Sequence, residues 1–456
     1  MKVVIVGCTH AGTIAATQIL NAHPDAEVVI YERNDNVSFL SCGIAVYLSG
    51  EIGDPDAMFY SSPKQLEEMG ATVKVKHNVL SVDPDTKTLE VENQETGELT
   101  ADFYDKLIIT TGSWPVIPPV SGLENKNLYL CKTYYHAKKL FNVAKDSKKI
   151  VVVGGGYIGV ELVEAYLRQG REVTLIDSSD QMLIKYFDKQ YADRIGRIFK
   201  DHNAHLELQQ RVTGFEDDGN GGVKVLTNKG KVYDADMAVL CVGFRPNSDL
   251  VRGKIDLHPD GTIKTNAYMQ TSNPDIYAGG DVTSVHFNPT NTDRYVPLAT
   301  NAVRQGTIAG VNVFGNTMKY MGTQSTTGLH LFGNTMVCTG LTLRRAKEMG
   351  IDADSVTIED NYRPEFMPTT TPVFMTLVWE KGTRRILGAQ FMSKHDVSQS
   401  ANLVSVCIQN RNSIDFLAYV DTLFQPNFDR PFNYVNLLAQ AAVTKEDKKV
   451  SKSSRR

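Results

Sequence analysis

The chain has 456 residues, of which 42% are hydrophobic, so it can build the cores of two or three domains. A formal net charge of −4 gives no sign of a polyanion partner, and we expect no nucleic-acid binding. No apolar run approaches the roughly 20 residues that a membrane span needs, and the chain enters a strand too soon for a signal peptide. Six cysteines without close pairing favour a reducing location, so we expect a cytoplasmic protein with no membrane partner.

The first motif is a glycine-rich loop that follows a continuous apolar run at residues 3–6. The run predicts a strand buried on both faces, and Gly7 and Gly12 predict a tight turn and a closely packed helix. The N-terminus of that helix offers free N–H groups to a pyrophosphate. Glu32 ends the next apolar run, about 20 positions later, where a carboxylate can accept hydrogen bonds from a ribose. Thr9 replaces the usual middle glycine, so the backbone there must approach a pyrophosphate less closely.

A second loop of this kind follows the apolar run at residues 150–153 and has full G-x-G-x-x-G spacing at Gly154, Gly156 and Gly159. Asp177 ends the next apolar run, again about 20 positions later. An acid here hydrogen-bonds a free 2′-hydroxyl and repels a 2′-phosphate, so we expect NADH rather than NADPH. The small neutral side chains beside it leave residual NADPH use open. Strand, loop, helix, strand and acid in this order, found twice, predict two Rossmann-like dinucleotide-binding domains.

Cys42 lies between the two loops, in the sequence Ser-Cys-Gly. A thiol placed between two dinucleotide sites indicates a group that exchanges electrons with them. A free cysteine is more often a small buried hydrophobe, and we assign that role to the cysteines in or beside apolar runs, namely Cys131, Cys241, Cys338 and Cys407. Cys8, in the first loop, is interpreted as a packing residue, with a redox role left open.

Two further apolar runs, at residues 106–112 and 237–243, end in small residues, and proline-containing segments follow them. We interpret both as strand ends where the chain leaves one nucleotide domain for the other. The segment 271–281 predicts a turn, a short strand and two glycines before Asp281, whose carboxylate could accept hydrogen bonds from a polyhydroxyl chain.

No nucleotide loop follows residue 325. Residues 373–379 and 386–391 are typical of antiparallel strands, and residues 402–410 and 434–443 of helices, which predicts a third domain of α+β character. The basic end, residues 446–456, is expected to be disordered. No cluster of histidine, cysteine or carboxylate has the spacing of metal ligands, and we expect no metal.

The order of flavin loop, cysteine, NAD loop, Gly-Asp motif and C-terminal α+β domain resembles the pyridine nucleotide–disulfide oxidoreductases. Residues 38–43 resemble the single-cysteine branch of that family, because Tyr47 stands where the disulfide-forming members need a second cysteine. Three segments look most like the water-forming NADH oxidases of this branch: residues 43–45, 59–63 and 424–431. The resemblance implies an α/β fold with two Rossmann-like domains, for FAD and NAD, and a C-terminal α+β dimerisation domain.

The resemblance also implies domain bounds and site residues. FAD would be held by residues 1–112 and 245–323, NADH by 113–244, and a homodimer by 324–456. The residues that match FAD contacts are Gly7, Thr9, His10, Ala11, Gly12, Glu32, Arg33, Cys42, Val79, Thr110, Thr111, Gly112, Ser113, Lys132, Asp281, Leu298, Ala299, Thr300 and Phe424. Those that match NAD contacts are Gly154, Gly156, Tyr157, Ile158, Gly159, Asp177, Tyr186, Gly243 and Gly328. Phe424 matches a residue that reaches the flavin of the partner subunit, and Tyr157 an aromatic that covers the flavin until nicotinamide displaces it.

The implied reaction reduces O₂ to water with electrons from NADH. Peroxide is the natural first product, and a thiolate can attack its O–O bond and become a sulfenic acid. We therefore expect Cys42 to cycle between thiolate and sulfenic acid, with its thiolate stabilised by a cation or a helix N-terminus. His10 matches the acid–base histidine that lies by this cysteine in the family. The alternative for His10 is a histidine that only hydrogen-bonds nearby backbone.

Other functions stay open on the sequence alone. An NADH peroxidase shares almost all of these motifs, and a coenzyme A disulfide reductase would use the same cysteine in a mixed disulfide. A flavoprotein that hands electrons to a protein partner would keep both loops without needing Cys42. A dinucleotide-binding regulator would have no turnover at all.

Overall fold

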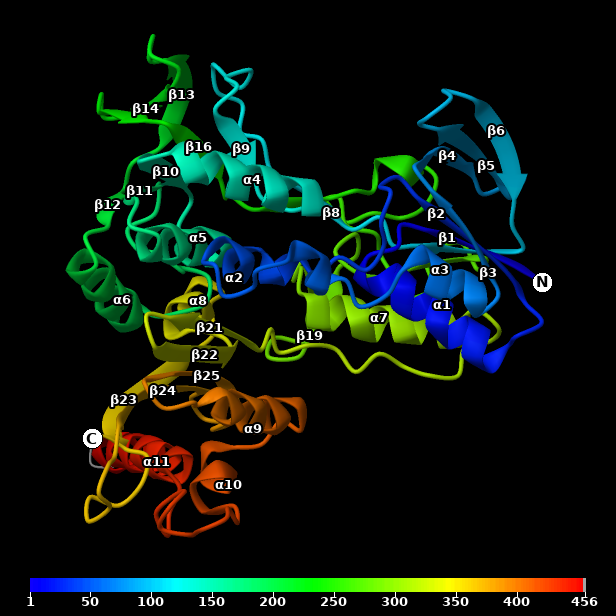
Figure 1. Ribbon diagram of the computed structural model, residues 1–456. Coiled ribbons are helices and arrows are strands. Elements are labelled where there is room, and N and C mark those ends of the chain that lie inside the picture. Colours follow the sequence, from blue (N-terminus) through cyan, green and yellow to red (C-terminus); the bar gives the residue numbers. More distant parts are fainter. Residues whose placement is uncertain (454–456) are drawn as a thin grey trace.

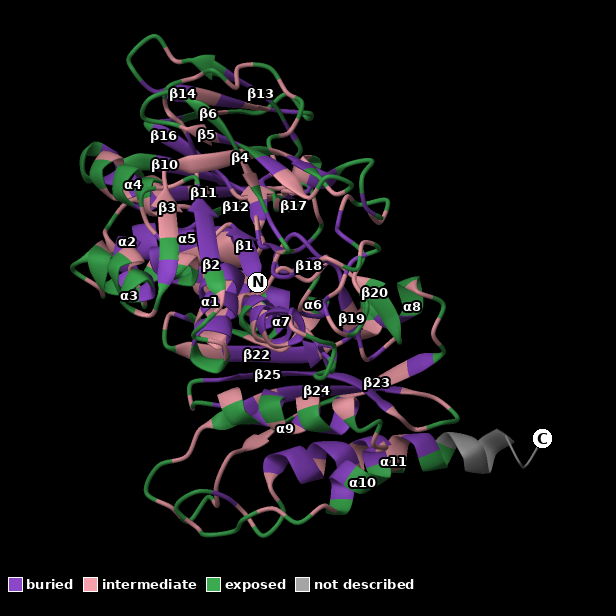
Figure 2. Ribbon diagram, turned by 90° about the vertical axis from the view of Figure 1, so that its right-hand side faces the viewer, coloured by how far each residue is buried: buried purple, intermediate pink, exposed green. Residues whose placement is uncertain are grey.

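The computed structural model describes residues 1–453 and forms three packed units (Figure 1). The first unit contains a five-stranded parallel sheet in the order β18-β7-β1-β2-β3. Its strands are β1 (Lys2–Val6), β2 (Glu27–Glu32), β3 (Ala71–Val75), β7 (Lys106–Ile109) and β18 (Ile276–Ala278). Helices α1 (His10–Ala22) and α7 (Ala299–Asn312) pack against each other and against this sheet. Every residue of β1 is buried, as the continuous apolar run predicts (Figure 2).

The second unit repeats this arrangement with a five-stranded parallel sheet in the order β12-β11-β10-β16-β9. Its strands are β9 (Leu128–Leu130), β10 (Lys149–Val153), β11 (Glu172–Asp177), β12 (His205–Leu208) and β16 (Met237–Leu240), and its helices are α4 (Tyr134–Asp146), α5 (Tyr157–Arg168) and α6 (Lys189–Asp201). In both sheets the strand before the glycine loop is central and pairs with the strand that ends in the acid. The prediction of two Rossmann-like units is therefore confirmed.

The two segments in which the chain is predicted to cross between the nucleotide domains lie side by side. β8 (Ser113–Pro115) and β17 (Phe244–Pro246) form an antiparallel pair, so the chain leaves and re-enters the first unit at one place. The remaining short elements are α2 (Ile44–Leu48), α3 (Pro63–Glu68), the 3₁₀ turns η1 (Ser41–Gly43), η2 (Pro55–Met58) and η3 (Asp249–Val251), and the strands β4 (His77–Asp83), β5 (Thr88–Asn93), β6 (Leu99–Phe103), β13 (Val212–Asp217), β14 (Val223–Thr227), β15 (Val232–Ala235), β19 (Val285–Phe287) and β20 (Thr292–Arg294).

The third unit is the expected α+β domain, built on a five-stranded antiparallel sheet in the order β21-β22-β25-β24-β23. Its elements are β21 (Thr327–Leu331), β22 (Asn334–Gly340), α8 (Leu343–Glu348), β23 (Ala353–Asn361), β24 (Pro372–Glu380), β25 (Ile386–Ser393), α9 (Ser398–Gln409), α10 (Ile414–Tyr419) and α11 (Tyr434–Ser453). Among the described residues, no helix is long and apolar enough to cross a membrane.

The prediction of a disordered end from residue 446 is wrong for the part that the structure describes. Helix α11 continues to Ser453, and residues 454–456 lie outside the described residues. Glu446 is buried and accepts a hydrogen bond of 3.1 Å from Nε1 of Trp379, a side chain with no exposed surface. The charged sequence predicts solvation, but this buried partner fixes the helix to the sheet.

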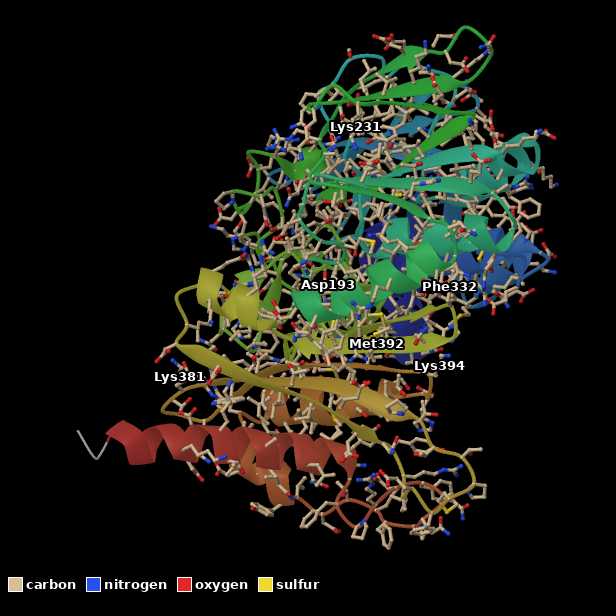
Figure 3. The ribbon with its side chains drawn as sticks, turned by 90° about the vertical axis from the view of Figure 1, so that its left-hand side faces the viewer. Asp193, Lys231, Phe332, Lys381, Met392 and Lys394 are labelled. Carbon is tan, nitrogen blue, oxygen red and sulfur yellow. The ribbon has the colours of Figure 1, made fainter. Side chains whose placement is uncertain are left out.

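A buried polar contact joins the second and third units. The carboxylate of Asp188 accepts the N–H groups of Leu343 and Arg344 at 3.1 and 3.2 Å and Nε2 of Gln390 at 2.7 Å. The Gln390 side chain in turn accepts the N–H of Asp188 at 2.7 Å. Met392 belongs to the same hydrophobic core as the second Rossmann unit, and Figure 3 labels it at this boundary. The third unit thus contributes side chains to the hydrophobic core of the second unit.

Asp188→Ala tests this contact. The change leaves two helix N–H groups and the Gln390 amide without their buried acceptor, so we expect the free energy of unfolding to fall by about 2–3 kcal/mol. Urea unfolding followed by tryptophan fluorescence, to which the buried Trp379 contributes, measures it. The control is Asp193→Ala, which removes an exposed pair with Lys189 on the same helix and should change stability by less than about 0.5 kcal/mol. Equal midpoints for both variants would contradict the assignment.

Candidate active site

The two glycine loops have the same geometry for the same steric reason. Gly7 and Gly154 have φ of +92° and +109°, a region that favours glycine. A Cβ on Gly12 would lie 2.0 Å from the carbonyl oxygen of Gly7, and one on Gly159 would lie 1.9 Å from that of Gly154. The start of each helix therefore lies directly on the turn that precedes it, which only a residue without a side chain permits.

The acid at the end of each second strand supports its own loop. Glu32 accepts the N–H of Cys8 at 2.7 Å, and Asp177 accepts the N–H of Gly155 at 2.5 Å. The second oxygen of Asp177 accepts the N–H of Ser179 at 2.6 Å. Burial is the main cause that raises the pKa of Glu32 above its ordinary value. The sequence predicts these acids as ribose ligands; their bonds to the loops are what it missed.

A cavity of about 450 Å³ lies at the first loop. The predicted FAD residues that line it are Gly7, Thr9, His10, Ala11, Glu32, Arg33, Val79, Thr110, Thr111, Gly112, Ser113, Lys132 and Asp281. Further lining residues that the sequence analysis missed are Asn34, Asn36, His77, Trp114, Tyr134, Tyr135, Arg245, Asn247 and Asp249. Several of these follow the two crossing segments, where the Trp-Pro and Arg-Pro sequences were a usable signal.

The geometry of the loops fits pyrophosphate groups. At Gly156 the φ is −78° and an added Cβ would meet no protein atom within 4 Å, so neither backbone strain nor packing requires glycine there. An open approach to the loop N–H groups does require it. Thr9 stands at this position in the first loop and lines the cavity. Leu298 precedes α7, and Ala299 and Thr300 begin it; a later residue of the same helix, Ala302, lines the cavity.

A charged cluster at the cavity joins three distant segments. Ser113 donates to Oδ2 of Asp281 at 2.7 Å, and Nζ of Lys132 lies 3.1 Å from the Ser113 hydroxyl and 3.3 Å from the same carboxylate. The Lys132 ammonium also lies 4.5 Å from the centre of the Phe244 ring. This pair contributes opposite effects to the pKa values of both His10 and Cys42. The two predicted catalytic residues therefore lie in one electrostatic environment.

Cys42 lies in the short turn η1 and precedes α2. Its side chain is exposed, yet burial by surrounding protein is the main cause that raises the pKa of its thiol, followed by the charge of Glu161. Lys132 lowers that pKa and Asp281 raises it. The expectation that protein groups stabilise the Cys42 thiolate is thus wrong. Burial and the nearby carboxylates raise the thiol pKa by more than the one cation, Lys132, lowers it.

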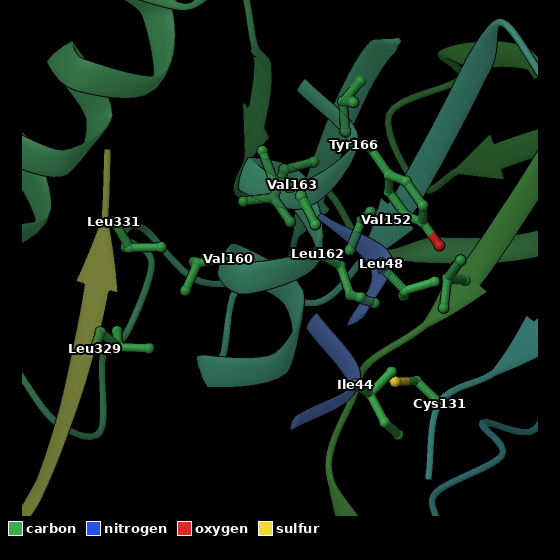
Figure 4. Packing of buried hydrophobic residues seen from close by; sticks show 14 of the residues in the cluster. Ile44, Leu48, Cys131, Val152, Val160, Leu162, Val163, Tyr166, Leu329 and Leu331 are labelled. Carbon is green, nitrogen blue, oxygen red and sulfur yellow. The ribbon is translucent and has the colours of Figure 1, made fainter. Parts of the chain in front are cut away.

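The other cysteines fit the predicted packing roles. Cys8 has no exposed surface, and burial raises the pKa of its thiol to about 12, which makes it a poor nucleophile at neutral pH. Cys131, Cys338 and Cys407 are buried, and Cys241 is half-buried. Figure 4 shows Cys131 beside Ile44 of α2, in the hydrophobic core that continues through α5.

His10 is the first residue of α1, and its Nδ1 lies 2.9 Å from the hydroxyl of Tyr60. The two rings are parallel, with their centres 5.8 Å apart. Burial is the main cause that lowers the pKa of His10, opposed by Asp281. The alternative of a histidine bound only to backbone is not what the structure shows, because this partner is a side chain.

The predicted NAD residues lie on several elements of the second and third units. Tyr157 begins α5, its ring packs edge-on against Tyr186 with centres 4.2 Å apart, and its hydroxyl lies 3.7 Å from Sγ of Cys338. Ile158 follows on the same helix and is half-buried, Gly243 follows β16 with φ of +106°, and Gly328 lies on β21. Their contacts with NADH, like the role of Tyr157 as a flavin cover, stay predictions.

Two further features bear on the site. Glu161, which the sequence analysis missed, lies one turn after Tyr157 on α5, and burial raises the pKa of its carboxyl to about 7. In the third unit, Phe424 lies in a loop with exposed apolar side chains, which include Leu423, Phe428 and Phe432. Such a surface is typical of an interface between subunits.

Among the described residues, no group of histidine, cysteine and carboxylate side chains could hold a metal ion.

Comparison with known proteins identifies the family. Residues 1–306 match the model described as pyridine nucleotide-disulphide oxidoreductase, and residues 327–434 match the dimerisation domain of that family. A curated relative, an NADH oxidase of Enterococcus faecalis, is 52% identical over 443 residues, which are 97% of this chain and 99% of the relative. An NADH oxidase of Streptococcus pyogenes is 40% identical over 97% of this chain and 99% of its own length. The solved structure of a water-forming NADH oxidase from Lactobacillus brevis, bound to NADH, has 55% identity and a TM-score of 0.97, and the match covers 99% of this chain and 100% of that one. The chain therefore belongs to the pyridine nucleotide–disulphide oxidoreductases.

Proposed function

We propose that this protein is a FAD-dependent NADH oxidase that reduces O₂ by four electrons to two molecules of water. Its family is FAD-dependent, and its curated relatives are NADH oxidases that match over almost the whole chain. The observation that carries the proposal is the state of the thiols: all six cysteines lie in the described residues, and Cys42 alone is exposed. Tyr47, at the position of the family's second cysteine, is buried and stacks on Phe141. Cys42 therefore has no sequence neighbour with which to form a disulfide.

FAD, held by the cavity residues of the first unit, supplies two-electron transfer between NADH and oxygen or an oxidised sulfur. The chain itself supplies the cleavage of the O–O bond. The thiolate of Cys42 attacks one oxygen of hydrogen peroxide, and the O–O bond breaks as the S–O bond forms. The other oxygen leaves as hydroxide and takes the proton that neutral His10 accepted from the Cys42 thiol when the thiolate formed, which yields one water and Cys42 sulfenic acid. Two further electrons and two protons return the sulfenic acid to the thiol and release the second water.

We also propose the FAD and NAD contacts and the domain bounds that the family resemblance implies. Asp177 would bind the ribose of NADH, and Tyr157 and Tyr186 would flank the nicotinamide side. A homodimer is supported by the match to the family's dimerisation domain and by the exposed apolar side chains around Phe424. We also propose a cytoplasmic location, in keeping with six free cysteines.

The stoichiometry of the reaction tests the role of Cys42. The wild-type protein should consume two NADH per O₂, and added catalase should return no oxygen, because the peroxide is reduced by the thiol. Cys42→Ser should consume one NADH per O₂, with half the oxygen returned by catalase. An oxygen electrode and NADH absorbance measure both quantities.

The control is Cys407→Ala, which removes a buried thiol in the C-terminal core and should keep the wild-type ratio. A Cys42→Ser variant that still forms only water would contradict the proposal. A wild-type protein that consumes little O₂ would direct the same assay to peroxide and to coenzyme A disulfide.

The charge of Glu161 gives a pH prediction. This carboxylate raises the pKa of Cys42, so Glu161→Gln should lower that pKa and increase the thiolate fraction at a given pH. The effect should be present above about pH 7, where Glu161 is ionised, and should vanish below it. The rate of Cys42 alkylation by iodoacetamide, followed against pH by mass spectrometry, measures it. Glu67→Gln, on the exposed surface of α3, is the charge-matched control and should leave the profile unchanged.

Cofactor preference depends on Asp177. Replacing it with alanine, together with Ser178→Arg, removes the carboxylate that repels a 2′-phosphate and adds a cation that binds one. We expect the ratio of kcat/KM for NADPH to that for NADH to rise by at least about tenfold. An engineered NADPH oxidase with 55% identity and a TM-score of 0.97 has an aspartate-to-alanine change among its substitutions. Ser179→Arg, one residue further on, is the control for added charge alone; an equal gain in that variant would contradict the role of Asp177.

A further inference from the structure

Tyr60 connects the loop that carries His10 to the segment that carries Cys42. The Tyr60 hydroxyl lies 3.2 Å from the carbonyl oxygen of Thr9 and 2.9 Å from Nδ1 of His10. Both contacts lie within hydrogen-bond distance. Nothing in the sequence pattern marks this pairing, because the two residues are 50 positions apart.

The neighbours of Tyr60 fix its position. Phe59 forms a bridge with Phe39, on the segment that leads to Cys42. Ser61 donates its N–H to the Ser38 hydroxyl at 2.8 Å, and that hydroxyl donates to the carbonyl oxygen of Ser61 at 2.7 Å. Ser38 has no exposed surface, and its own N–H donates to the carbonyl oxygen of Cys8 in the first loop. Tyr60 is therefore held between two anchored residues.

The hydrogens available to the Tyr60 hydroxyl and the His10 ring select one tautomer of His10. A tyrosine hydroxyl has one hydrogen to donate, and a carbonyl oxygen can only accept. Both contacts of Tyr60 are hydrogen bonds only when its hydrogen points to Thr9 and His10 donates from Nδ1. The neutral imidazole then carries its hydrogen on Nδ1 and its lone pair on Nε2. Among the described residues, the structure shows no protein partner for Nε2.

We propose that Tyr60 is a positioning residue that holds neutral His10 in the Nδ1–H tautomer, so that Nε2 is the nitrogen that exchanges the proton at Cys42. This inference rests on the acid–base role of His10 in the proposed function. Burial raises the pKa of Tyr60, so its hydroxyl remains a neutral donor throughout the working range. The charged groups that face His10 from other segments are Asp281 and Lys132.

The tautomer can be observed directly in the holoenzyme. The chain has 10 histidines, so ¹⁵N-labelled histidine spectra of the wild type and of His10→Gln identify the His10 signals. We expect the wild type to show Nδ1 protonated and Nε2 unprotonated above the pKa of His10. Tyr60→Phe keeps the stacked ring and removes the hydroxyl, and should show both tautomers. A wild-type signal from the Nε2–H tautomer would overturn the inference.

The kinetic test uses a double-mutant cycle. Tyr60→Phe should slow the reaction of the reduced holoenzyme with hydrogen peroxide by about fivefold to tenfold, the usual effect of one lost hydrogen bond, without slowing flavin reduction by NADH. In a His10→Gln background the same change should have no further effect, because its target is absent. Tyr268→Phe, outside the residues that line the cavity, is the control for loss of a tyrosine hydroxyl and should leave both steps unchanged.

The outcomes separate the inference from the proposed function. Equal slowing by Tyr60→Phe in both backgrounds would show a structural role and overturn the inference. If His10→Gln itself leaves the peroxide step unchanged, the acid–base role of His10 fails, and with it the proton transfer through Nε2. The spectra would then still show whether Tyr60 sets the tautomer.

Discussion

The structure depends on one steric constraint, used twice: the start of a helix lies directly on the turn that ends the central strand. Gly12 and Gly159 permit that contact because a Cβ would lie about 2 Å from the carbonyl oxygen of the turn. A neighbouring strand end presses on the same turn, since a Cβ on Gly7 would lie 2.5 Å from the oxygen of Thr110, and one on Gly154 2.4 Å from that of Cys241. Loop, helix N-terminus and two strand ends therefore meet at one edge of each sheet. Open α/β sheets bind ligands at this edge.

The acids that end the second strands also stabilise this junction. Glu32 and Asp177 each accept an N–H from the residue after the first glycine of their loop. Because these hydrogen bonds join each carboxylate to its loop, the loop and the acid are fixed relative to each other. Replacing either acid would therefore remove a hydrogen bond that holds its loop.

Local patterns in the sequence were sufficient to predict the two Rossmann units, their acids and the antiparallel C-terminal sheet, because glycine spacing and apolar runs report directly on backbone geometry. Local patterns could not predict properties that depend on contacts between residues far apart in the sequence. Helix α11 extends past residue 446 because Glu446 meets Trp379, 67 positions earlier. The pKa of Cys42 rises because of burial and because Glu161, on another unit, faces it. The contact of His10 with Tyr60 likewise joins segments that no local pattern relates.

Helix α5 connects the third unit to the segment that carries Cys42. Its Glu164 accepts the N–H of Phe332, in the hairpin between β21 and β22, at 2.6 Å. Gln169, just after the helix, donates to the carbonyl oxygen of Leu48 at the end of α2, the helix that follows Cys42. The same helix presents Glu161, whose charge acts on the Cys42 thiol. The hairpin and Asp188 both join the third unit to the second, and α5 in turn contacts the helix that follows Cys42. The C-terminal unit, which matches the family's dimerisation domain, is therefore joined through α5 to the segment that carries Cys42.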